Sequence, residues 1–317
     1  MPEKKKKEGV FKYIFGPAPS RRLGVSLGLD LVPPKTCTLD CLYCEVGRTT
    51  VKTVQRFHHN MAEALLMELE AYLNSPGPEL DYITLAGSGE PTLNREIGSI
   101  IQMIKEIAPI KVAVLTNGSL LDQEEVRSDL ALADLVVPSL DAASPETFQQ
   151  LNRPHKSLGL ERIINGLIAF REEFIGQIWL EILVVKGIND QDEELEALRD
   201  IAARIKPNRL QINTVFRPPA DASAQPVSQD ELKRITRFFG PQAEEAVKFK
   251  KAFPKTGRAE AEKEILNLVG RRPCSAEDLA SVLALPASQV TKILAHLIND
   301  GVILREDHAD SIFFRRV

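Results

Sequence analysis

Cysteine is scarce in this chain, with four residues among 317. So few cysteines exclude the disulfide framework of a small secreted protein and favour a reducing, cytoplasmic setting. Hydrophobic runs long enough to span a bilayer are also missing, and no apolar stretch of the signal-peptide type follows Lys4–Lys7. We therefore expect a cytoplasmic protein that does not associate with membranes.

An excess of charge of one sign is missing as well. With 44 acidic and 40 basic residues the formal net charge is −4, which gives no global attraction to nucleic acid. The first 56 residues are locally basic, with eleven basic and five acidic side chains, Arg21 and Arg22 among the former. This segment is either a rim that attracts a phosphorylated substrate or RNA, or a solvated tail.

What the chain does have is a repeating order over residues 25–215. Short apolar runs, typical of strands buried on both faces, alternate with amphipathic segments of helical length. The expected strands are 25–31, 82–86, 111–116, 135–139, 179–185 and 209–213, and the expected helices are 61–74, 95–107, 124–131, 160–174 and 193–205. This order predicts an α/β fold with a parallel sheet, and both an open sheet and a partial barrel fit it.

Three of the four cysteines, Cys37, Cys41 and Cys44, fall within eight residues in the spacing C-x3-C-x2-C. A structural zinc ion takes four closed ligands, whereas three thiolates can hold a cubane iron–sulfur cluster and leave one iron open. The alternative is a zinc site completed by Cys274 or a histidine. Cys274 itself resembles an ordinary small residue near a helix start.

Polar residues follow the ends of the expected strands. In α/β sheets and β/α barrels ligands bind at the carboxyl ends of the strands, so these residues are candidates for one shared site. In chain order they are Gly87, Gly89, Glu90, Asn117, Ser139, Asp141, Asn189 and Arg217.

The cysteine spacing, with Tyr43 before its last cysteine, and the later Gly87-Ser-Gly-Glu-Pro91 closely resemble the motifs of the radical S-adenosylmethionine superfamily. The match covers residues 10–219. The segment Phe15–Gly24 looks like a branch often grouped with the wyosine-type tRNA base synthases, although the cysteines of a second cluster are lacking here. The resemblance implies a partial (β/α)6 barrel of the radical S-adenosylmethionine type.

The resemblance also implies roles for single residues. Cys37, Cys41 and Cys44 would each ligate one iron of a [4Fe–4S] cluster, and S-adenosylmethionine would chelate the fourth iron. Electron transfer to the sulfonium would then give a 5′-deoxyadenosyl radical. The residues expected to bind this cofactor are Gly87, Gly89, Glu90, Asn117, Ser139, Asp141, Glu181, Asn189 and Arg217.

Several of these residues also have a plainer interpretation. Asn117 fits a left-handed turn before Gly118, and Asp141 fits a carboxylate at a helix N-terminus. Glu181 lies in an apolar strand, where an unpaired carboxylate is costly, so it faces a ligand inside the barrel or forms a buried ion pair. Arg217 grips a carboxylate, of S-adenosylmethionine or of the substrate, or belongs to a rigid surface turn.

The pattern changes after residue 219. Prolines and small residues at 218–226 indicate a linker, and a helix is expected at 228–239. Three helices at 261–269, 276–283 and 287–299 and a hairpin of 302–306 with 311–316 predict a winged helix-turn-helix. We thus expect a barrel domain with a basic N-terminal segment over 1–219, a linker and connecting helix over 220–258, and a winged-helix domain over 259–317.

Residues 260–317 hold seven basic and nine acidic side chains, and the expected recognition helix offers only Lys292 and His296. DNA binding is therefore disfavoured, and a protein-binding or substrate-presenting module fits better.

The leading hypothesis is a radical S-adenosylmethionine enzyme that takes electrons from a low-potential donor of the flavodoxin or ferredoxin type. Its expected substrate is a tRNA, another nucleotide-containing molecule or a protein. One alternative is an activase that makes a glycyl radical on a partner protein. The alternative from another class is a zinc-bearing, winged-helix regulator that binds nucleic acid.

Overall fold

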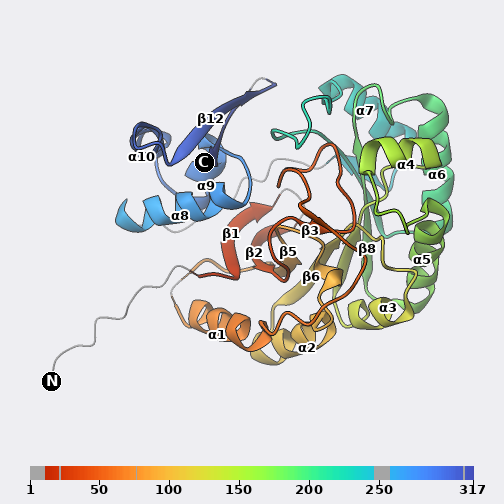
Figure 1. The fold of residues 1–317 in the computed structure, drawn as a ribbon, viewed down its shortest axis with the longest axis horizontal. Helices are drawn as coiled ribbons and strands as arrows, with labels where there is room; N and C mark the ends of the chain where they lie inside the picture. The colour runs from red at the N-terminus through yellow and green to blue at the C-terminus, as the bar shows by residue number, and fades with distance from the viewer. Residues whose placement is uncertain (1–10, 21–22, 76, 246–257, 310) are drawn as a thin grey trace.

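The computed structural model describes residues 11–20, 23–75, 77–245, 258–309 and 311–317 (Figure 1). The basic residues Lys4–Lys7, Arg21 and Arg22 lie outside these described residues.

A sheet of eight strands forms the centre of the molecule, in the order β1-β2-β5-β6-β7-β8-β9-β10. Its six inner strands run parallel to one another and follow sequence order. They are β2 (Gly24–Asp30), β5 (Tyr82–Ala86), β6 (Lys111–Thr116), β7 (Leu135–Pro138), β8 (Gln177–Val184) and β9 (Arg209–Thr214). All six strands expected from the sequence are confirmed, with bounds shifted by at most two residues.

The helices that connect these strands lie along one outer side of the sheet (Figure 1). They are α1 (Ala62–Leu73), α2 (Ile97–Ile107), α3 (Glu124–Leu130), α5 (Leu160–Glu173) and α6 (Asp192–Ile205), as the periodicity predicts. Strands laid down in sequence order with right-handed crossovers put every helix on the same face. That face forms the main core, where side chains such as Leu65, Ile100 and Leu198 are fully buried. The other face is left for a site.

Several elements were not expected from the sequence. The edge strand β1 (Ile14–Ser20) pairs antiparallel with β2, and α4 (Pro145–Asn152) follows β7. Short pieces form β3 (Thr36–Cys37) with β4 (Val51–Lys52), and the 3-10 helix η1 (Pro91–Leu93). α7 (Gln229–Phe238) matches the expected connecting helix, but β10 (Ala243–Glu245) pairs with β9, so the sheet extends into the expected linker segment.

The C-terminal residues form a smaller unit with its own core. Its elements are α8 (Arg258–Arg271), β11 (Cys274–Ser275), α9 (Ala276–Leu283), α10 (Ala287–Asn299), β12 (Ile303–His308) and β13 (Ser311–Arg316). The strands pair in the order β11-β13-β12, and Ser275 begins α9 with a reciprocal capping box. Cys274 is buried in this core, far in sequence from the other cysteines.

No single helix of the described chain has the length and apolarity to cross a membrane; α9 and α10, bent by 118° at their junction, pass that test only as a pair.

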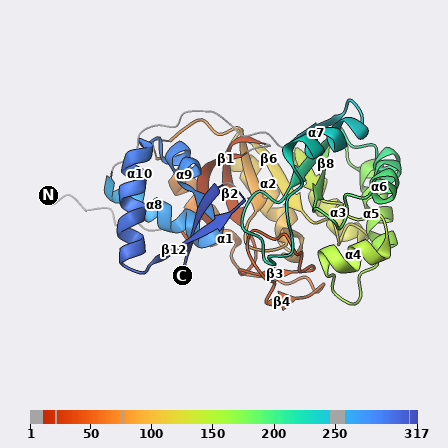
Figure 2. The same ribbon diagram turned by 90° about the horizontal axis from the view of Figure 1, so that it is seen from above.

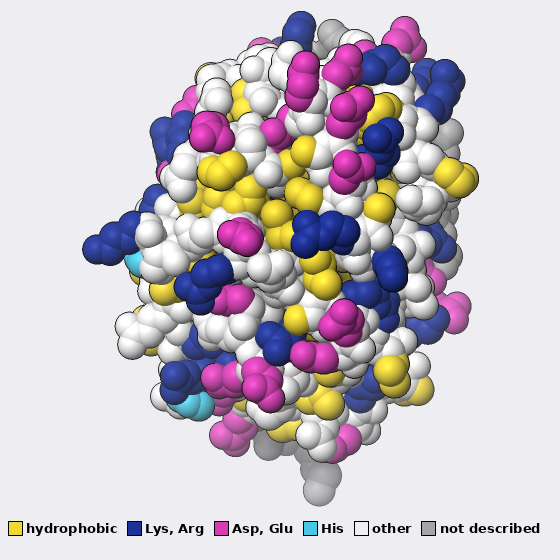
Figure 3. Space-filling model, turned by 90° about the vertical axis from the view of Figure 1, so that its right-hand side faces the viewer, with side chains coloured by type: hydrophobic (Ala, Val, Ile, Leu, Met, Phe, Trp, Pro, Cys, Tyr) yellow, Lys and Arg dark blue, Asp and Glu magenta, His cyan; other side chains and the backbone are white. Residues whose placement is uncertain are grey.

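The C-terminal unit packs beside β1 at one end of the sheet, while α4, α5 and α6 lie toward the other end (Figure 2). Over the face of the molecule shown in Figure 3, acidic and basic side chains are interspersed, so no large area there carries one sign of charge.

Arg271, at the end of α8, fastens the C-terminal unit to the sheet. Its guanidinium lies 2.6 Å from Asp30 Oδ2, donates to the carbonyl of Lys12, and stacks on the ring of Phe15 with 4.7 Å to the centroid. Asp30 is 7% exposed, and its two oxygens also accept from the amide and hydroxyl of Ser88. Burial raises the pKa of Asp30, and these hydrogen bonds and the arginine oppose that rise.

Replacing Arg271 by alanine should lower the free energy of unfolding by about 2–3 kcal/mol, because a buried carboxylate loses its cation. Arg272→Ala is the matched control, since its half-exposed guanidinium lies 3.7 Å from Glu45 and should cost under about 1 kcal/mol. Urea denaturation followed by circular dichroism measures both. Equal losses for the two variants would contradict this account of the interface.

Candidate active site

A cavity of about 410 Å³ lies on the face of the sheet that the helices leave free, at the carboxyl ends of the strands. Eleven of the twelve residues expected at the site line it: Cys37, Cys41, Cys44, Gly87, Gly89, Glu90, Asn117, Ser139, Asp141, Glu181 and Arg217. Asn189 does not. The C-terminal unit closes part of the wall with Leu268, Arg271 and Arg272.

The cysteine loop, residues 31–56, follows β2 and folds back on itself. The Cys44 amide donates to the carbonyl of Cys41 at 3.2 Å, and the Gly47 amide donates to that of Cys44 at 3.2 Å. All three thiols are free and partly exposed to the cavity. Burial raises the pKa of the Cys37 thiol to about 12 and also raises the pKa values of Cys41 and Cys44. A thiol must lose its proton to bind a metal, so cluster binding would release these protons.

Helix α4 holds the cysteine loop in place. The carbonyls of Leu151 and Asn152, in its last turn, accept the amides of Leu42 (2.9 Å) and Asp40 (3.0 Å). Backbone groups that a helix end leaves without partners are thus satisfied by the loop. This helix was not expected from the sequence, although Ser144 and Pro145 are a good N-terminal signal for one.

Asn152 is a functional candidate that the sequence did not reveal. It is 3% exposed, and its side-chain nitrogen lies 3.4 Å from Cys41 Sγ and 3.1 Å from Asp141 Oδ2. The amide can thus donate to the sulfur and to the carboxylate together. The packing of α4 against the cysteine loop brings Asn152, Cys41 and Asp141 together, and this packing cannot be predicted from a sequence motif.

Asn117 makes a second amide-to-sulfur contact. Its side-chain nitrogen lies 3.5 Å from Cys37 Sγ and donates to Thr38 Oγ1 at 2.8 Å. The left-handed residue in this turn is Gly118, with φ +71°, and Asn117 is not left-handed, so the plain turn interpretation is wrong. Two asparagine amides, Asn117 from the loop after β6 and Asn152 from the end of α4, therefore face two of the three cysteine sulfurs.

Glu90 ties the glycine loop to the end of β6. Glu90 is buried, with 2% of its surface exposed. Its carboxylate accepts four hydrogen bonds: from the amide and hydroxyl of Thr92 (3.0 and 2.6 Å), the hydroxyl of Thr116 (2.6 Å) and the amide of Asn117 (2.8 Å). Burial raises its pKa, and these donors oppose the rise. A carboxylate has about four lone-pair sites, so an ammonium group would have to share oxygens that are already in use.

Gly87 and Gly89 leave no room for a larger side chain. A Cβ at Gly89 would lie 2.2 Å from the carbonyl oxygen of Thr36, and one at Gly87, where φ is +126°, would lie 2.5 Å from Asp30. The glycine loop and the cysteine loop therefore touch through their backbones. The Lys35 amide donates to the Ser88 carbonyl at 2.6 Å across this contact.

Asp141 is the centre of a buried network. Its Oδ1 accepts from the amide of Leu183 at 2.9 Å, and its Oδ2 accepts from Asn152 and from the hydroxyl of Tyr43. Burial raises its pKa to about 6, against these hydrogen bonds. The helix-terminus interpretation of Asp141 is wrong, because Ser144 caps α4.

Ser139 and Glu181 lie side by side on neighbouring strands. They form an isolated parallel bridge, and the Leu140 amide donates to the Glu181 carbonyl at 2.9 Å. The carboxylate of Glu181 points to the cavity and accepts from Asn213 Nδ2 at 3.2 Å.

Asn189 is placed differently from the expectation. It is fully buried behind the cavity wall, and its amide is engaged by backbone: it donates to the carbonyls of Asp141 and Leu183 at 2.8 Å each and accepts from the amide of Val185 at 2.7 Å. The expected direct contact with a cofactor is therefore wrong. Asn189 fixes the end of β8 beside Asp141.

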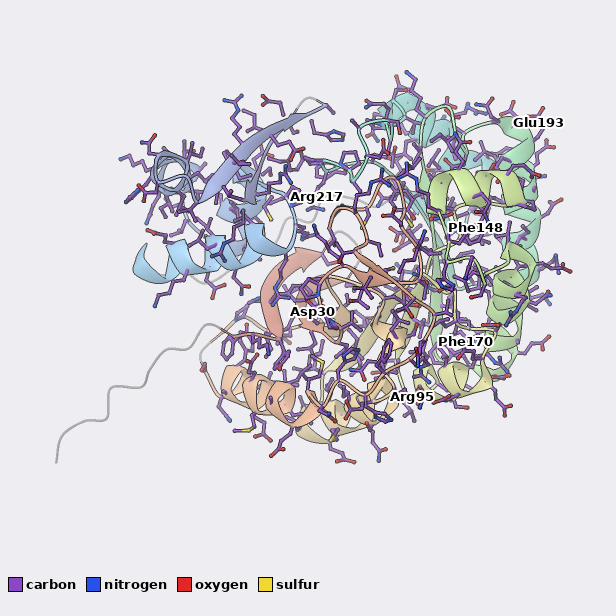
Figure 4. All side chains as sticks on the ribbon, in the orientation of Figure 1. Asp30, Arg95, Phe148, Phe170, Glu193 and Arg217 are labelled. Atoms are coloured by element: carbon purple, nitrogen blue, oxygen red, sulfur yellow. The ribbon has the colours of Figure 1, made fainter. Side chains whose placement is uncertain are left out.

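Arg217 joins the cysteine loop to the C-terminal unit (Figure 4). It is 5% exposed, and one guanidinium nitrogen lies 3.1 Å from both oxygens of Glu45, while the other lies 3.2 Å from Asp278 in α9. The surface-turn interpretation is wrong. The guanidinium does grip carboxylates, but they are the protein's own, and one of them adjoins Cys44.

The donor set fits a cluster better than a single ion. Within the described residues, no three His, Cys, Asp or Glu side chains are placed to hold one metal ion. In a four-iron cube each cysteine binds a separate iron, so the sulfurs do not converge on one point. The two amide-to-sulfur contacts are also the outer-shell partners that thiolate ligands of a cluster use. These observations favour a cubane cluster over the zinc alternative.

A model of the family described as the Radical SAM superfamily matches residues 31–199. Among curated proteins, "GTPase Obg" of Brachyspira hyodysenteriae is 38% identical over 299 residues, covering 93% of this chain and 44% of that protein. The chain thus spans less than half of that relative's length. "UPF0026 protein MJ1312" of Methanocaldococcus jannaschii is 30% identical over 313 residues, covering 95% of each.

Solved structures share the fold. One of TYW1 with a lysine–pyruvate adduct bound has a TM-score of 0.50 and 17% identity, and the alignment covers 68% of this chain and 72% of that chain.

The close approach of Gly89 to the cysteine loop can be tested by substitution. Gly89→Ala should lower the free energy of unfolding by about 1–3 kcal/mol, because its Cβ cannot fit against a carbonyl oxygen 2.2 Å away. Gly159→Ala is the matched control, since no atom lies within 4 Å of its Cβ position. Chemical denaturation compares the two. An undisturbed Gly89→Ala protein would show that the two loops are not in backbone contact.

Proposed function

Since the chain belongs to the radical S-adenosylmethionine superfamily, whose members use a [4Fe–4S] cluster and S-adenosylmethionine, we propose that it is an enzyme of this type with one cluster. The observation that carries the proposal is the shared cavity: three thiols on one loop face the glycine loop and the polar ends of four further strands. Scattered cysteines or a closed zinc site would not produce this arrangement.

Cys37, Cys41 and Cys44 would hold the cluster. When bound, the cluster supplies the electron that cleaves S-adenosylmethionine to a 5′-deoxyadenosyl radical. The chain's own residues then have distinct tasks. Asn117 and Asn152 donate to two of the ligand sulfurs, and the remaining wall of the cavity excludes water from the reaction.

S-Adenosylmethionine would lie along the carboxyl ends of β5 to β9. Gly87 and Gly89 allow its close approach, and Ser139 and Glu181 offer acceptors for an ammonium or for ribose hydroxyls. Glu90 can bind the ammonium only by sharing oxygens that already accept four hydrogen bonds. Because Asp141, Asn189 and Arg217 are engaged by other protein groups, we propose that they position the loops around the cofactor. Arg217 meets the cofactor carboxylate only if it gives up part of its contact with Glu45.

We propose that the C-terminal unit is a winged helix-turn-helix and that it presents the substrate to the cavity. Its contribution of Leu268, Arg271 and Arg272 to the cavity wall supports this role. We propose the division that the sequence predicts: a partial (β/α)6 barrel over 1–219, a connecting segment over 220–258 that contains β10, and a winged helix over 259–317. DNA readout by α10 has little support, since His296 faces Asp300 at 3.0 Å on the same helix.

We favour a tRNA or another nucleotide-containing molecule as substrate, on the resemblance of the Phe15–Gly24 segment to the wyosine-type branch. A protein substrate, as for a glycyl-radical activase, is the alternative. A reducing cytoplasm with a low-potential flavodoxin or ferredoxin suits either reaction.

The cluster assignment has a direct test. Anaerobic reconstitution of the natural chain should give about four irons per chain and reductive cleavage of S-adenosylmethionine. Cys44→Ala should lose both, whereas Cys274→Ala, which removes a thiol of the C-terminal core, should keep both. Iron and zinc analysis with quantification of 5′-deoxyadenosine measures the outcome. Full cleavage by Cys44→Ala, or zinc in place of iron in the natural chain, would refute the proposal.

The amide-to-sulfur contact of Asn152 should affect the potential of the cluster. Asn152→Ala removes a hydrogen bond that stabilises negative charge on sulfur, so the midpoint potential should become more negative while iron content is retained. Asn299→Ala, an exposed asparagine on α10, is the control. A redox titration followed by electron paramagnetic resonance measures the shift. Identical potentials for both variants would show that Asn152 does not act on the cluster.

A further inference from the structure

Exposed basic side chains surround the outer side of the cysteine loop. We name Lys35, Arg48, Lys52, Arg153 and Lys156 the loop-side basic patch. Four of them are exposed and Arg153 is partly exposed. Among the described residues 31–56 and 151–160 no acidic side chain is exposed; Asp40 and Glu45 are both partly buried. Within these two described segments every exposed charged side chain is therefore basic, whereas the face shown in Figure 3 carries both signs of charge.

Hydrogen bonds and ion pairs hold three of these residues, Arg48, Lys52 and Arg153, in fixed positions relative to one another. Lys52 Nζ donates to the carbonyl of Arg153 at 3.0 Å, which joins the cysteine loop to the segment after α4. Arg48 and Arg153 share Asp221, at 3.3 and 2.7 Å, so one carboxylate sets the spacing of two guanidinium groups. Asp40 is the other nearby carboxylate, 3.0 Å from Arg48. Five cations against two carboxylates leave the patch positive.

Backbone pairing places two residues of the patch, Lys35 and Lys52, close to Cys37. In the β3–β4 pair, Lys52 is opposite Cys37, and Lys35 accepts the amide of Val51 at 3.1 Å through its carbonyl. Val51 is 51% exposed and gives the patch an apolar contact point. A partner seated here would lie against the far side of the loop that carries the thiols.

None of the five patch residues lines the cavity, whereas all three cysteines do. A molecule on the patch is therefore separated from the cavity by the loop. An atom that contacts only the patch does not enter the cavity, but an electron can cross the loop. Within the described residues 31–56 and 151–160 no phenylalanine, tyrosine or tryptophan is fully exposed for a nucleobase to stack on, which argues against an RNA partner.

From this geometry we infer that the loop-side basic patch is the docking surface for an acidic electron-transfer protein. The inference rests on the proposed function. In the step, the partner's reduced flavin or iron–sulfur group loses one electron, and the cluster held by the three cysteines gains it. No bond is formed or broken in this transfer. Charge complementarity would steer the encounter and make it salt-dependent.

The probe is a bacterial flavodoxin, an acidic protein, tested with the chain both before and after cluster reconstitution. Lys35→Glu/Lys156→Glu reverses two exposed charges of the patch. Lys111→Glu/Lys206→Glu makes the same charge change at two exposed lysines beside the opposite ends of the strands. Binding is measured by calorimetry at low and high salt, and cluster reduction by stopped-flow absorbance with flavodoxin hydroquinone or with dithionite.

The patch variant should bind flavodoxin about tenfold or more weakly than the control variant, with a smaller salt dependence. It should also accept electrons more slowly from flavodoxin but at the normal rate from dithionite. Equal flavodoxin affinity for the two variants would overturn the inference. So would a patch variant that loses affinity for bulk tRNA while it keeps flavodoxin binding. Flavodoxin binding is also measured with the cluster-free chain, so it does not depend on iron. A chain that binds no iron would therefore refute the proposed function and leave the result on flavodoxin binding intact.

Discussion

The backbone contact between the cysteine loop and the glycine loop is the constraint on which the rest of the cavity depends. Thr36 accepts the amide of Glu90 at 3.0 Å, and Lys35 donates to Ser88 on the other side of the same contact. Only glycine fits at position 89 between them. Once the loops meet, Glu90 collects donors from η1 and β6, and Asn117 is brought to Cys37. The positions of the thiols thus follow from main-chain geometry more than from cysteine spacing.

The sequence predicts the parallel sheet well, because each inner strand is an apolar run with a clear end. It predicts elements poorly where local signals are weak. β1 contains Pro17 and Pro19 and is held by pairing with β2, and β10 has only three residues, Ala243–Glu245, that gain strand geometry from β9. Such strands are stabilised by pairing with a neighbouring strand, so the hydrophobic periodicity of their own residues does not predict them.

The candidate site shows the same division. Residues at strand ends, such as Gly87 and Ser139, could be placed in advance because parallel strands deliver their carboxyl ends to one edge. The partners of each side chain could not. Asn152 reaches Cys41 from α4, a helix that the sequence pattern did not predict, and Asn189, on the expected loop, donates to backbone carbonyls instead of facing the cavity. Chain position fixes which residues are near the cavity, while packing decides which of them face it.

Arg217 shows that the two units of this chain are not separable modules. Its buried guanidinium is neutralised by Glu45, next to Cys44, and by Asp278 in α9. A chain cut between the units would leave this arginine with half of its counter-charge and open one flank of the cavity. Domain exchange between relatives would meet the same obstacle, because a new C-terminal unit must supply a carboxylate at the place of Asp278. A change on one side of this junction therefore needs a matching change on the other side.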